Sequence, residues 1–463
     1  MGNELAFFVE ISLSFMHFTV SEIVGKTGGR LVRGEHNFVI NAVSTDSRTL
    51  ASGDLFVAII GENFDGHDFV SHVEQNGAIG AVVSRASEIK LPVVIEVRDT
   101  LVAYGEIANL HRNRFDVPIV AITGSNGKTT TKDMVAEVLA QRCSVFKSEK
   151  NFNNRIGIPN RLLQLSAQDE VGVLEIGSNQ PGEIKHLSGI VEPDVAVITN
   201  IGFSHLEFLG SIEGVFKEKS AILENVDLAI LSADDVYTER LRREFPVEVV
   251  TFGYKHSADV SASNIRIDNY GKPRFRLQLD HQDVEDIRLP CAGAHNISNA
   301  LAAACVGKWA GLTHREIRIG LENFSPPDMR LQWIELDDFN IINDAYNSNP
   351  NSVQVALGML SDTHIKGKRI AVLGDMLELG AQSAQLHFEV GRCIRPNVKT
   401  LITVGNCSRQ IADGIQHQMA SIDHCYTADE AVDALRRVVD LGDLVLLKGS
   451  RGIELEKILR GFL

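Results

Sequence analysis

The segment "TGSNGKTTT", from Thr123 to Thr131, combines two closely spaced glycines with a lysine and a run of threonines. The apolar run "VPIVAIT" leads into it and is typical of a buried strand, whereas "TTTKDMVAEVLAQR" continues with helical periodicity. A strand, a glycine turn and a helix N-terminus direct backbone N–H groups toward an anion. The segment therefore predicts a phosphate site, in which Lys128 is a mobile cation and the Thr129 hydroxyl is available to Mg²⁺.

This loop is shorter than the common phosphate loop, whose pattern is G-x-x-x-x-G-K-[ST]. The residue five positions before Gly127 is Ile122, where that pattern requires a glycine. A tight turn without a ligand is the alternative, and the sequence G-K-T-T-T at the head of a helix argues against it. The predicted nucleotide-binding residues of the loop are Gly124, Ser125, Asn126, Gly127, Lys128, Thr129 and Thr130.

Glu175 and His205 each come after another apolar run, in "VGVLEIG" and "VAVITNIGFSH". Ligands of parallel sheets bind outside the carboxyl ends of the strands, so both side chains are expected at the same edge as Lys128. A carboxylate is a suitable oxygen ligand for Mg²⁺. A histidine is a less usual one, and an ordinary loop histidine is the alternative for His205.

Two further polar groups have simple structural alternatives. Lys217 and Lys219, in "GVFKEKSAIL", fit the solvated face of a helix. Asn296, in "CAGAHNISNALAAACVG", fits a helix cap. Neither group indicates a function without its surroundings.

The elements that must position these residues alternate between strand and helix along the whole chain. This alternation predicts the α/β class with mostly parallel sheets. After Thr251 the pattern changes to polar–apolar alternation in "IRIDNYGKPRFRLQL", which predicts an antiparallel hairpin with its turn at 269–271. The prolines of "SPPDMR" indicate a linker, after which "RIAVLGDM", "TLITVGN" and "DLVLLKGS" predict a further set of strands.

Length and composition describe an ordinary globular protein. The chain has 463 residues, enough for roughly two to four domains, with 44% hydrophobic and 23% charged residues. A formal charge of −15 argues against a nucleic-acid partner. The six scattered cysteines contain no C-x-x-C pair and favour reduced thiols in the cytoplasm. No apolar run is long enough to span a membrane, and residues 1–15 are assigned no function.

Taken together, these motifs resemble the Mur ligase family. "TGSNGKTTT" is similar to the short phosphate loop of its ATP-dependent members, G-[ST]-N-G-K-[ST]. The resemblance extends from Phe18 nearly to the C-terminus and includes "NFNNRIGIP", "LEIGSN", "TNIGFSHLE", "AGAHNISNA", "NDAYNSNP", "VLGDMLELG" and "LLKGSRG". It implies three α/β domains: a UDP-substrate-binding domain over 16–115, a central P-loop ATPase-type domain over 116–328, and a Rossmann-like C-terminal domain over 329–463 that binds the incoming amino substrate.

The resemblance also implies a reaction in peptidoglycan precursor synthesis. "NFNNRIGIP", "DAYNSNP" and "GDMLELG" are most similar to the member that adds D-alanyl-D-alanine to UDP-N-acetylmuramoyl-tripeptide, using ATP and Mg²⁺. Another Mur ligase and a folylpolyglutamate synthetase are the alternatives within the superfamily, although no D-N-P-R tetrapeptide of the diaminopimelate-adding member occurs here. A nucleotide-binding regulator is the alternative from another class. A cytoplasmic monomer is expected.

The resemblance assigns roles to individual residues. Those assigned to catalysis are Lys128, His205, Lys219 and Arg330. Those assigned to metal binding are Thr129, Glu175, His205 and Lys219, the last as a carbamylated lysine. Beyond the loop, those assigned to the nucleotide are Asn296, Arg330, Asp344 and Tyr346. Those assigned to the other substrates are Ser47, Arg48, Asn151, Asn153, Asn154 and Asn347.

Overall fold

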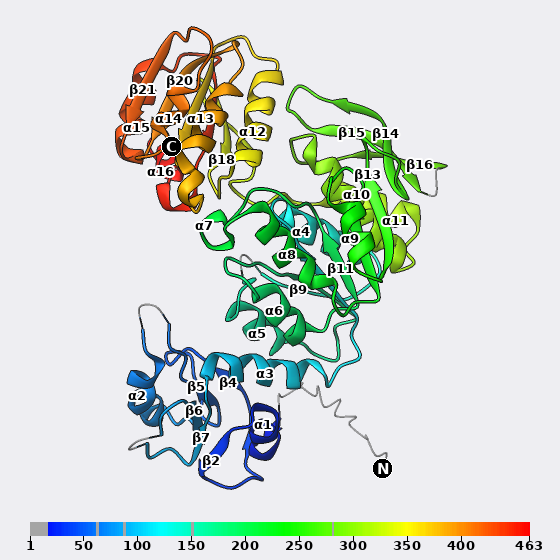
Figure 1. The fold of residues 1–463 in the computed structure, drawn as a ribbon, viewed down its shortest axis with the longest axis vertical. Helices are drawn as coiled ribbons and strands as arrows, with labels where there is room; N and C mark the ends of the chain where they lie inside the picture. Colours follow the sequence, from blue (N-terminus) through cyan, green and yellow to red (C-terminus); the bar gives the residue numbers. More distant parts are fainter. Residues whose placement is uncertain (1–16, 62–63, 87–88, 150–151, 280–281) are drawn as a thin grey trace, which may run out of the picture. The chain divides into compact units, whose positions relative to one another are not determined.

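The computed structural model describes residues 17–61, 64–86, 89–149, 152–279 and 282–463. These residues form two compact units (Figure 1). The N-terminal unit takes in the described residues up to Pro118 together with Ser148–Glu170 and Gly189–Val191. The large unit takes in Ile119–Lys147, Val171–Ser188 and Glu192–Leu463.

The N-terminal unit contains a sheet in the order β2-β7-β6-β5-β4, in which only the β2–β7 pair is antiparallel. Its strands are β2 (Arg30–Arg33), β4 (Val43–Ser44), β5 (Leu55–Val57), β6 (Gly80–Val83) and β7 (Val93–Glu96). A short ladder joins β1 (Phe18–Thr19) to β3 (Val39–Ile40). The helices are α1 (Val20–Thr27), α2 (Val70–Gln75), α3 (Thr100–Arg112) and α5 (Gly157–Leu162). The apolar runs "GDLFVAII" and "AIGAVVS" supply the buried strands β5 and β6.

The large unit begins with a sheet in the order β16-β15-β14-β13-β12-β11-β8-β10-β9. Its parallel strands are β8 (Ile119–Thr123), β9 (Val145–Lys147), β10 (Val171–Glu175), β11 (Val195–Ile198), β12 (Leu228–Ser232), β13 (Glu248–Gly253) and β14 (Val260–Ile267). In register, Ile122 of β8 lies opposite Glu175 and Thr123 lies opposite Ile198. The ends of three neighbouring strands are thus level, and the loops that follow them share one edge.

The predicted hairpin is confirmed at the far end of this sheet. β14 pairs antiparallel with β15 (Pro273–Leu279), and β15 pairs with β16 (Gln282–Arg288). The turn contains Gly271 with φ +76°, a left-handed conformation that favours glycine.

Helices pack on the central sheet through an apolar core. Met134, Val135, Val138 and Leu139, on one face of α4 (Lys128–Leu139), are all fully buried. They share a core cluster with residues of β8, β10 and β11 and of α10 (His295–Trp309) and α11 (His314–Asn323). The remaining helices around this sheet are α6 (Glu183–Val191), α7 (Leu206–Leu209), α8 (Ile212–Ser220) and α9 (Thr238–Glu244).

The large unit ends with a second sheet, in the order β17-β18-β22-β19-β20-β21. Only β17 (Gln332–Glu335) runs antiparallel to its neighbour. The others are β18 (Asn340–Asp344), β19 (Arg369–Gly374), β20 (Val398–Val404), β21 (Ser421–Cys425) and β22 (Leu444–Lys448). Figure 1 shows α12 (Pro350–Asp362) and α15 (Ala428–Val438) on opposite sides of it, with α13 (Ser383–Arg392), α14 (Arg409–Asp413) and α16 (Glu456–Arg460) around them. The mixed α/β architecture with mostly parallel sheets confirms the predicted fold class.

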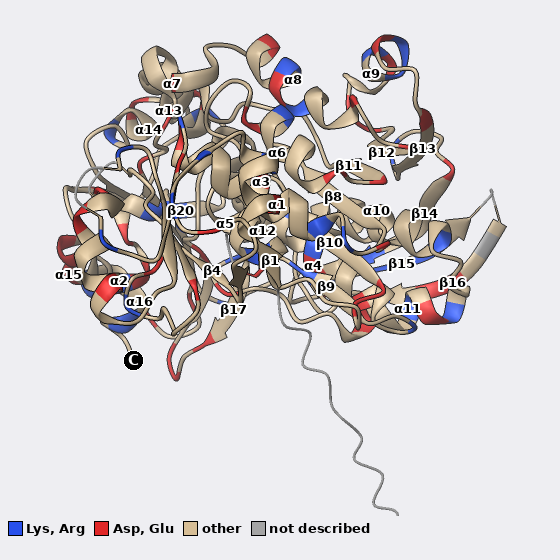
Figure 2. Ribbon diagram, turned by 90° about the horizontal axis from the view of Figure 1, so that it is seen from below, with Lys and Arg blue, Asp and Glu red and all other residues tan. Residues whose placement is uncertain are grey.

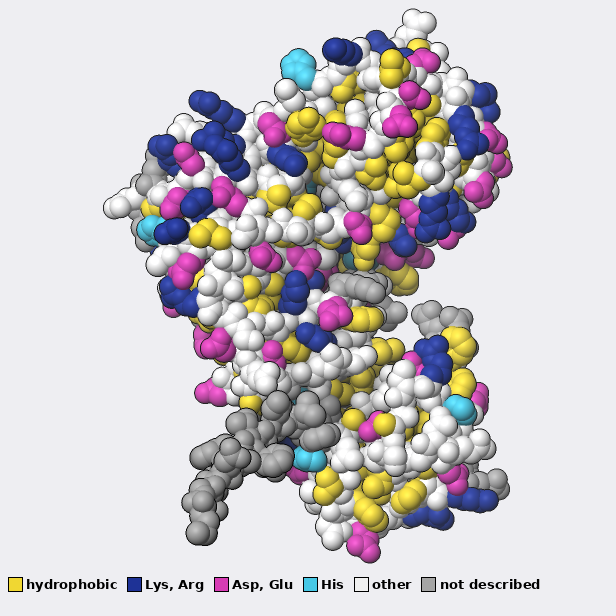
Figure 3. Space-filling view, turned by 180° about the vertical axis from the view of Figure 1, so that it is seen from behind, with side chains coloured by type: hydrophobic (Ala, Val, Ile, Leu, Met, Phe, Trp, Pro, Cys, Tyr) yellow, Lys and Arg dark blue, Asp and Glu magenta, His cyan; other side chains and the backbone are white. Residues whose placement is uncertain are grey.

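Charged side chains of both signs are mixed on the surface. In Figure 2, acidic and basic residues alternate over α11 and β16, and the face in Figure 3 shows the same mixture over the described residues. Within the described part of the chain, no helix is long and apolar enough to cross a membrane.

Candidate active site

The phosphate loop lies between β8 and α4, and two of its positions admit only glycine. Gly124 and Gly127 have φ values of +143° and +80°. A Cβ atom would lie 2.0 Å from Thr199 Oγ1 at Gly124 and 2.6 Å from Asn299 Oδ1 at Gly127. The loop with this short glycine spacing is therefore an intact structure, packed closely against Thr199 at one glycine and Asn299 at the other.

The loop is braced by the segment that follows β11. Ser125 Oγ donates a hydrogen bond to the Gly202 carbonyl at 2.8 Å and accepts one from the Gly202 N–H at 2.9 Å. Asn200 accepts from the N–H groups of Ser125 and Asn126, at 2.9 and 3.0 Å. The Thr199 hydroxyl donates to the Asn126 carbonyl at 2.6 Å. The N–H groups of Ser125 and Asn126 are thus already hydrogen-bonded to Asn200. The N–H groups in the first turn of α4 have no intrahelical partner, so these are the ones available to bind an anion.

Lys128 is folded back over its own loop. Its Nζ donates to the Gly124 carbonyl at 2.9 Å. Burial lowers the pKa of Lys128, the nearby Arg330 lowers it further, and Glu175 raises it. A cation held here beside a second cation is compensated best by an anionic ligand, as expected of a phosphate site.

Thr129 links the phosphate loop to two other predicted residues. Its Oγ1 donates to Glu175 Oε2 at 2.7 Å, and Arg330 Nη2 donates to Thr129 Oγ1 at 3.1 Å. Glu175 is 3% exposed at the end of β10. The structure thus brings together three residues that are distant in the sequence. The strand ends predict the proximity of Glu175 to the phosphate loop, whereas Arg330 was assigned from the family resemblance.

The backbone around Arg330 is held in an unfavourable conformation. The guanidinium lies 4.3 Å from the ring centroid of Tyr346, in a cation–π contact. Both neighbours, Met329 and Leu331, have left-handed φ values of +57° and +48°. Such residues persist where the surrounding structure fixes them, often at functional sites.

The surroundings of Lys217 and Lys219 distinguish the two lysines. Lys217 is exposed, whereas Lys219 is fully buried and its Nζ donates to Ser178 Oγ at 2.9 Å. Burial, together with the positive charge of Lys128, lowers the pKa of Lys219 to about 7, against the opposing effect of Glu218 and other carboxylates. Of the two lysines, Lys219 is the one that is buried and lies within electrostatic reach of Lys128 and Glu175, and its role as a metal ligand stays a prediction.

His205 lies beside the braced segment and contacts a residue that the sequence did not single out. The preceding Ser204 donates to Ser125 Oγ at 3.1 Å. His205 Nδ1 is 2.6 Å from Glu378 Oε2. The hydrogen bond from His205 lowers the pKa of Glu378, and partial burial raises it. Glu378 lies in "GDMLELG", in the loop that follows β19, and a carboxylate beyond a strand end is the signal that could have identified it.

Asn296 is not the N-terminal cap of α10, because its side chain is used differently. Its Nδ2 donates to the Ala292 carbonyl at 2.6 Å, and its Oδ1 accepts from Asn299 Nδ2 at 2.8 Å. Asn299 Oδ1 also accepts from the Thr131 hydroxyl at 3.2 Å, next to the phosphate loop. Asn299 was missed, although its spacing of three residues from Asn296 places both on one helical face.

Asp344 is paired with a second residue that sequence reasoning missed. Lys448, 2% exposed, lies with its Nζ 2.9 Å from Asp344 Oδ2 and 2.5 Å from the Asn347 carbonyl. The other Asp344 oxygen accepts from the Leu331 N–H at 3.2 Å. Lys448 ends the apolar run "DLVLLK". A charged residue at the end of a predicted strand is therefore the sequence signal that could have identified Lys448 as a site residue. The roles of Asp344 at the ribose and of Asn347 at the substrate stay predictions.

The residues predicted for the UDP and peptide ends lie in the N-terminal unit. Arg48 forms an ion pair with Asp46 at 2.7 Å, which lowers the pKa of that carboxyl to about 2. Asn154 Oδ1 accepts from the Gly157 N–H at 2.8 Å and so supports the start of α5. Ser47 and Asn153 are half-buried, and Asn151 lies outside the described residues. Their roles in substrate binding stay predictions.

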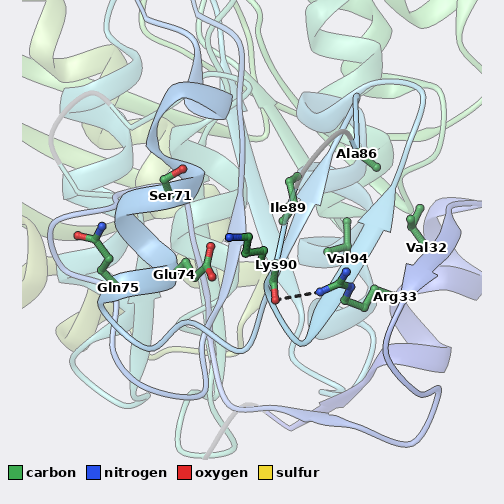
Figure 4. Close-up of a pocket in the computed structure, with 9 residues that line it drawn as sticks. All are labelled: Val32, Arg33, Ser71, Glu74, Gln75, Ala86, Ile89, Lys90 and Val94. Carbon is green, nitrogen blue, oxygen red and sulfur yellow. Dashed lines mark hydrogen bonds between the residues drawn. The ribbon is translucent and has the colours of Figure 1, made fainter.

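A groove in the N-terminal unit contains none of these residues. Figure 4 shows the side chains that line it, with Arg33 donating to the Lys90 carbonyl at 3.2 Å. Its lining residues are Val32, Arg33, Ser71, Glu74, Gln75, Ala86, Ile89, Lys90 and Val94.

The donor atoms at the phosphate loop fit Mg²⁺ that is shared with a nucleotide. No group of three or more His, Cys, Asp and Glu side chains able to hold a metal occurs in the described ranges of the chain. The Thr129 hydroxyl and the Glu175 carboxylate nevertheless form an adjacent pair of hard oxygen donors. Mg²⁺ commonly uses one or two such ligands and takes the rest from phosphates and water.

Three models of the Mur ligase family match the chain. "Mur ligase family, catalytic domain" matches residues 39–122, "Mur ligase middle domain" matches 122–307, and "Mur ligase, glutamate ligase domain" matches 329–451. These segments include the phosphate loop, Glu175, His205, Lys219 and Arg330.

Relatives of known identity match over nearly their full length. UDP-N-acetylmuramoyl-tripeptide–D-alanyl-D-alanine ligase of Bacillus subtilis (strain 168) is 35% identical over 456 residues, covering 96% of this chain and 97% of the relative. A crystal structure of MurF from Acinetobacter baumannii is 31% identical, with a TM-score of 0.90 and coverage of 97% and 99%. MurF ligase from Thermotoga maritima in complex with ADP is 28% identical, with a TM-score of 0.81 and coverage of 91% and 96%. With a phosphate loop of this type and similarity along the whole sequence, the chain belongs to the Mur ligase family.

Proposed function

We propose that this chain is an ATP-dependent ligase that joins D-alanyl-D-alanine to UDP-N-acetylmuramoyl-tripeptide in peptidoglycan precursor synthesis. The observation that carries the ATP-dependent chemistry is the partly buried cluster in which Thr129 contacts both Glu175 and Arg330 beside Lys128. The substrates follow from the name of the Bacillus subtilis relative, which is similar over nearly the whole chain.

The reaction that fits this cluster activates a carboxylate with ATP. A carboxylate oxygen of the tripeptide attacks the γ-phosphorus, ADP leaves, and an acyl phosphate forms. The amine of D-alanyl-D-alanine then attacks the acyl carbon, inorganic phosphate leaves, and the amine loses a proton. Two anions meet in the first step, so Lys128 and Arg330 are suited to offset the charge that develops on the transferred group.

We also propose that Thr129 and Glu175 hold Mg²⁺ together with the nucleotide. When bound, the ion would offset negative charge on the phosphates. Lys219 fits the same site as a carbamate, because a buried amine with a pKa of about 7 is available to CO₂ and the product is an anionic oxygen donor. The roles of His205 at a second ion, and of Asp344 and Asn296 at the nucleoside, belong to the same proposal.

The domain organisation and assembly state complete the proposal. We expect a UDP-substrate-binding domain over 16–115, a nucleotide-binding domain over 116–328 and an amino-substrate domain over 329–463. The protein is expected to act as a cytoplasmic monomer, which sedimentation at several concentrations would test.

The decisive experiment is ligation with defined substrates. Purified protein is incubated with ATP, Mg²⁺, D-alanyl-D-alanine and UDP-N-acetylmuramoyl-tripeptide carrying either lysine or diaminopimelate, and the products are identified by mass spectrometry. One pentapeptide product and one ADP per ligation are expected, with ATP turnover that requires the dipeptide. Extension of a shorter UDP-peptide by one amino acid would identify another Mur ligase, and glutamate addition to a folate would identify a folylpolyglutamate synthetase.

A further inference from the structure

Glu378 makes two contacts with the segment that begins at His205. Its carboxylate lies 2.6 Å from His205 Nδ1, and its backbone carbonyl accepts from the Glu207 N–H at 3.1 Å. Beside it, a Cβ atom at Gly380 would lie 3.1 Å from the Glu207 Cα. The loop that follows β19 therefore fits closely against the start of α7.

Both residues of the pair have an unfavourable backbone conformation. His205 has φ +51° and Glu378 has φ +62°, and in the described part of the chain only seven residues other than glycine have a positive φ. The side chains are 18% and 42% exposed, and a polar contact with this much solvent access contributes little to stability. The stability gained from this contact alone is thus a weak reason to hold two residues in this conformation.

The contact uses a defined nitrogen of the imidazole ring. A carboxylate at Nδ1 favours the form that carries a proton on Nδ1, so Nε2 is left for a ligand. His205 directly follows Ser204, which is hydrogen-bonded to Ser125 of the phosphate loop at 3.1 Å. The ring is therefore oriented at its base by the braced segment and at Nδ1 by Glu378.

We propose that Glu378 is a positioning residue that fixes the tautomer and orientation of His205 for phosphoryl transfer to the substrate carboxylate. This inference rests on the proposed ligase function, and it adds a residue from the loop after β19 to the nucleotide-binding side of the site. Outer partners of this kind typically contribute 10- to 100-fold to activity or ligand affinity.

Steady-state kinetics on the full chain test the role in the reaction. Glu378→Ala is expected to lower kcat about 10- to 100-fold while leaving the KM for ATP within about twofold. Glu378→Gln keeps an acceptor oxygen and should fall between Ala and the unmodified protein. Glu389→Ala, at an exposed glutamate on α13, is the matched control and should change kcat less than about twofold.

A double variant distinguishes positioning through His205 from a structural effect. In a His205→Ala background, the added Glu378→Ala change should cost less than about twofold in kcat, because the group it orients is gone. A full, multiplicative loss in the double variant would overturn the proposal, as would unchanged kcat in folded Glu378→Ala protein.

Nitrogen-15 NMR of histidine-labelled protein tests the pairing without turnover. The His205 signals, assigned from their loss in His205→Ala, should show a proton on Nδ1 in the unmodified protein, and Glu378→Ala should redistribute it between the two nitrogens. An unchanged tautomer would overturn the pairing. Absence of ligation by the unmodified protein would instead refute the proposed function, and the NMR result would still decide the Glu378–His205 contact.

Discussion

At the scale of single residues, Lys128 is the cation closest to the backbone of the phosphate loop. We expect Lys128→Ala to lower kcat/KM by about 10²–10³, the usual loss for one stabilising group in a polar active site. The fold should survive, because the change removes a half-buried charge whose pKa is lowered by desolvation. Ligation rates and thermal melting check this, with the exposed Lys185→Ala as control. Near-normal turnover in a folded Lys128→Ala protein would contradict the assignment.

Lys219 gives a second prediction at the same scale. With a pKa of about 7, roughly half of its amines are neutral at pH 7, whereas an ordinary lysine would be almost fully charged. Incubation with ¹³C-bicarbonate should therefore give a carbamate signal that weakens as the pH falls below 7, because protonation removes the nucleophile.

Variants of the two neighbouring lysines provide the control for this prediction. Lys219→Ala should lose the carbamate signal and the activity, and added acetate or formate should restore part of the activity. Lys217→Ala should retain both, because Lys217 is exposed. The reverse pattern would assign the modification to Lys217.

At the scale of elements, we expect alanine to have opposite effects on stability at a glycine of the phosphate loop and at a glycine inside a helix. Gly127→Ala should abolish nucleotide binding and destabilise the fold by about 1–2 kcal/mol, because alanine is unfavourable at positive φ and its Cβ would meet Asn299. Gly358→Ala, inside α12 with open space around its Cβ, should stabilise by about 0.5–1 kcal/mol. Chemical denaturation and a nucleotide-binding assay measure both. Equal stability changes in the two variants would contradict this account of the loop.

The elements themselves were largely predictable from sequence patterns. Continuous apolar runs identified β8, β10 and β11, and alternation identified the β14–β15 hairpin. A strand buried on both faces is apolar throughout, whereas a strand buried on one face alternates between apolar and polar residues. The level ends of the strands then placed Glu175 beside Thr129 without further information.

Partnerships that depend on tertiary structure were not predictable. Lys448 lies at the end of β22, Glu378 in the loop after β19 and Asn299 inside α10. Polar residues in loops and at the ends of elements commonly cap or turn the chain. Periodicity does not indicate which of them reaches across to another element. Similarly, burial alone distinguishes Lys219 from Lys217, two residues away on the same helix.

At the scale of the whole molecule, the proposed nucleotide site draws residues from both sides of the "SPPDMR" linker. Arg330, at the C-terminal end of that linker, contacts Thr129 at 3.1 Å. We expect an unreactive ATP analogue together with UDP-tripeptide to lower the radius of gyration more than either ligand alone, since a site assembled from two sections is complete only when they close. Small-angle scattering of the free, singly and doubly liganded protein measures this.

Variants of two arginines test the cause of that compaction. Arg330→Ala should reduce both the compaction and the ligation rate, whereas Arg392→Ala, at an exposed position on α13, should change neither. A constant radius of gyration in every state of an active protein would show that the two sections are fixed relative to each other.

The two hydrogen bonds of the Asn349 side chain limit which residues can replace it. Its Oδ1 accepts from the Ser352 N–H at 2.9 Å as the cap of α12, while its Nδ2 donates to Asn126 Oδ1 at 2.7 Å, across 223 residues of sequence. Aspartate and serine cap helices as well as asparagine does, so α12 alone would accept any of the three. Neither replacement supplies an amide N–H to Asn126, and aspartate would bring two acceptors together. A position that looks interchangeable from its own helix is thereby restricted to one residue type by a distant partner.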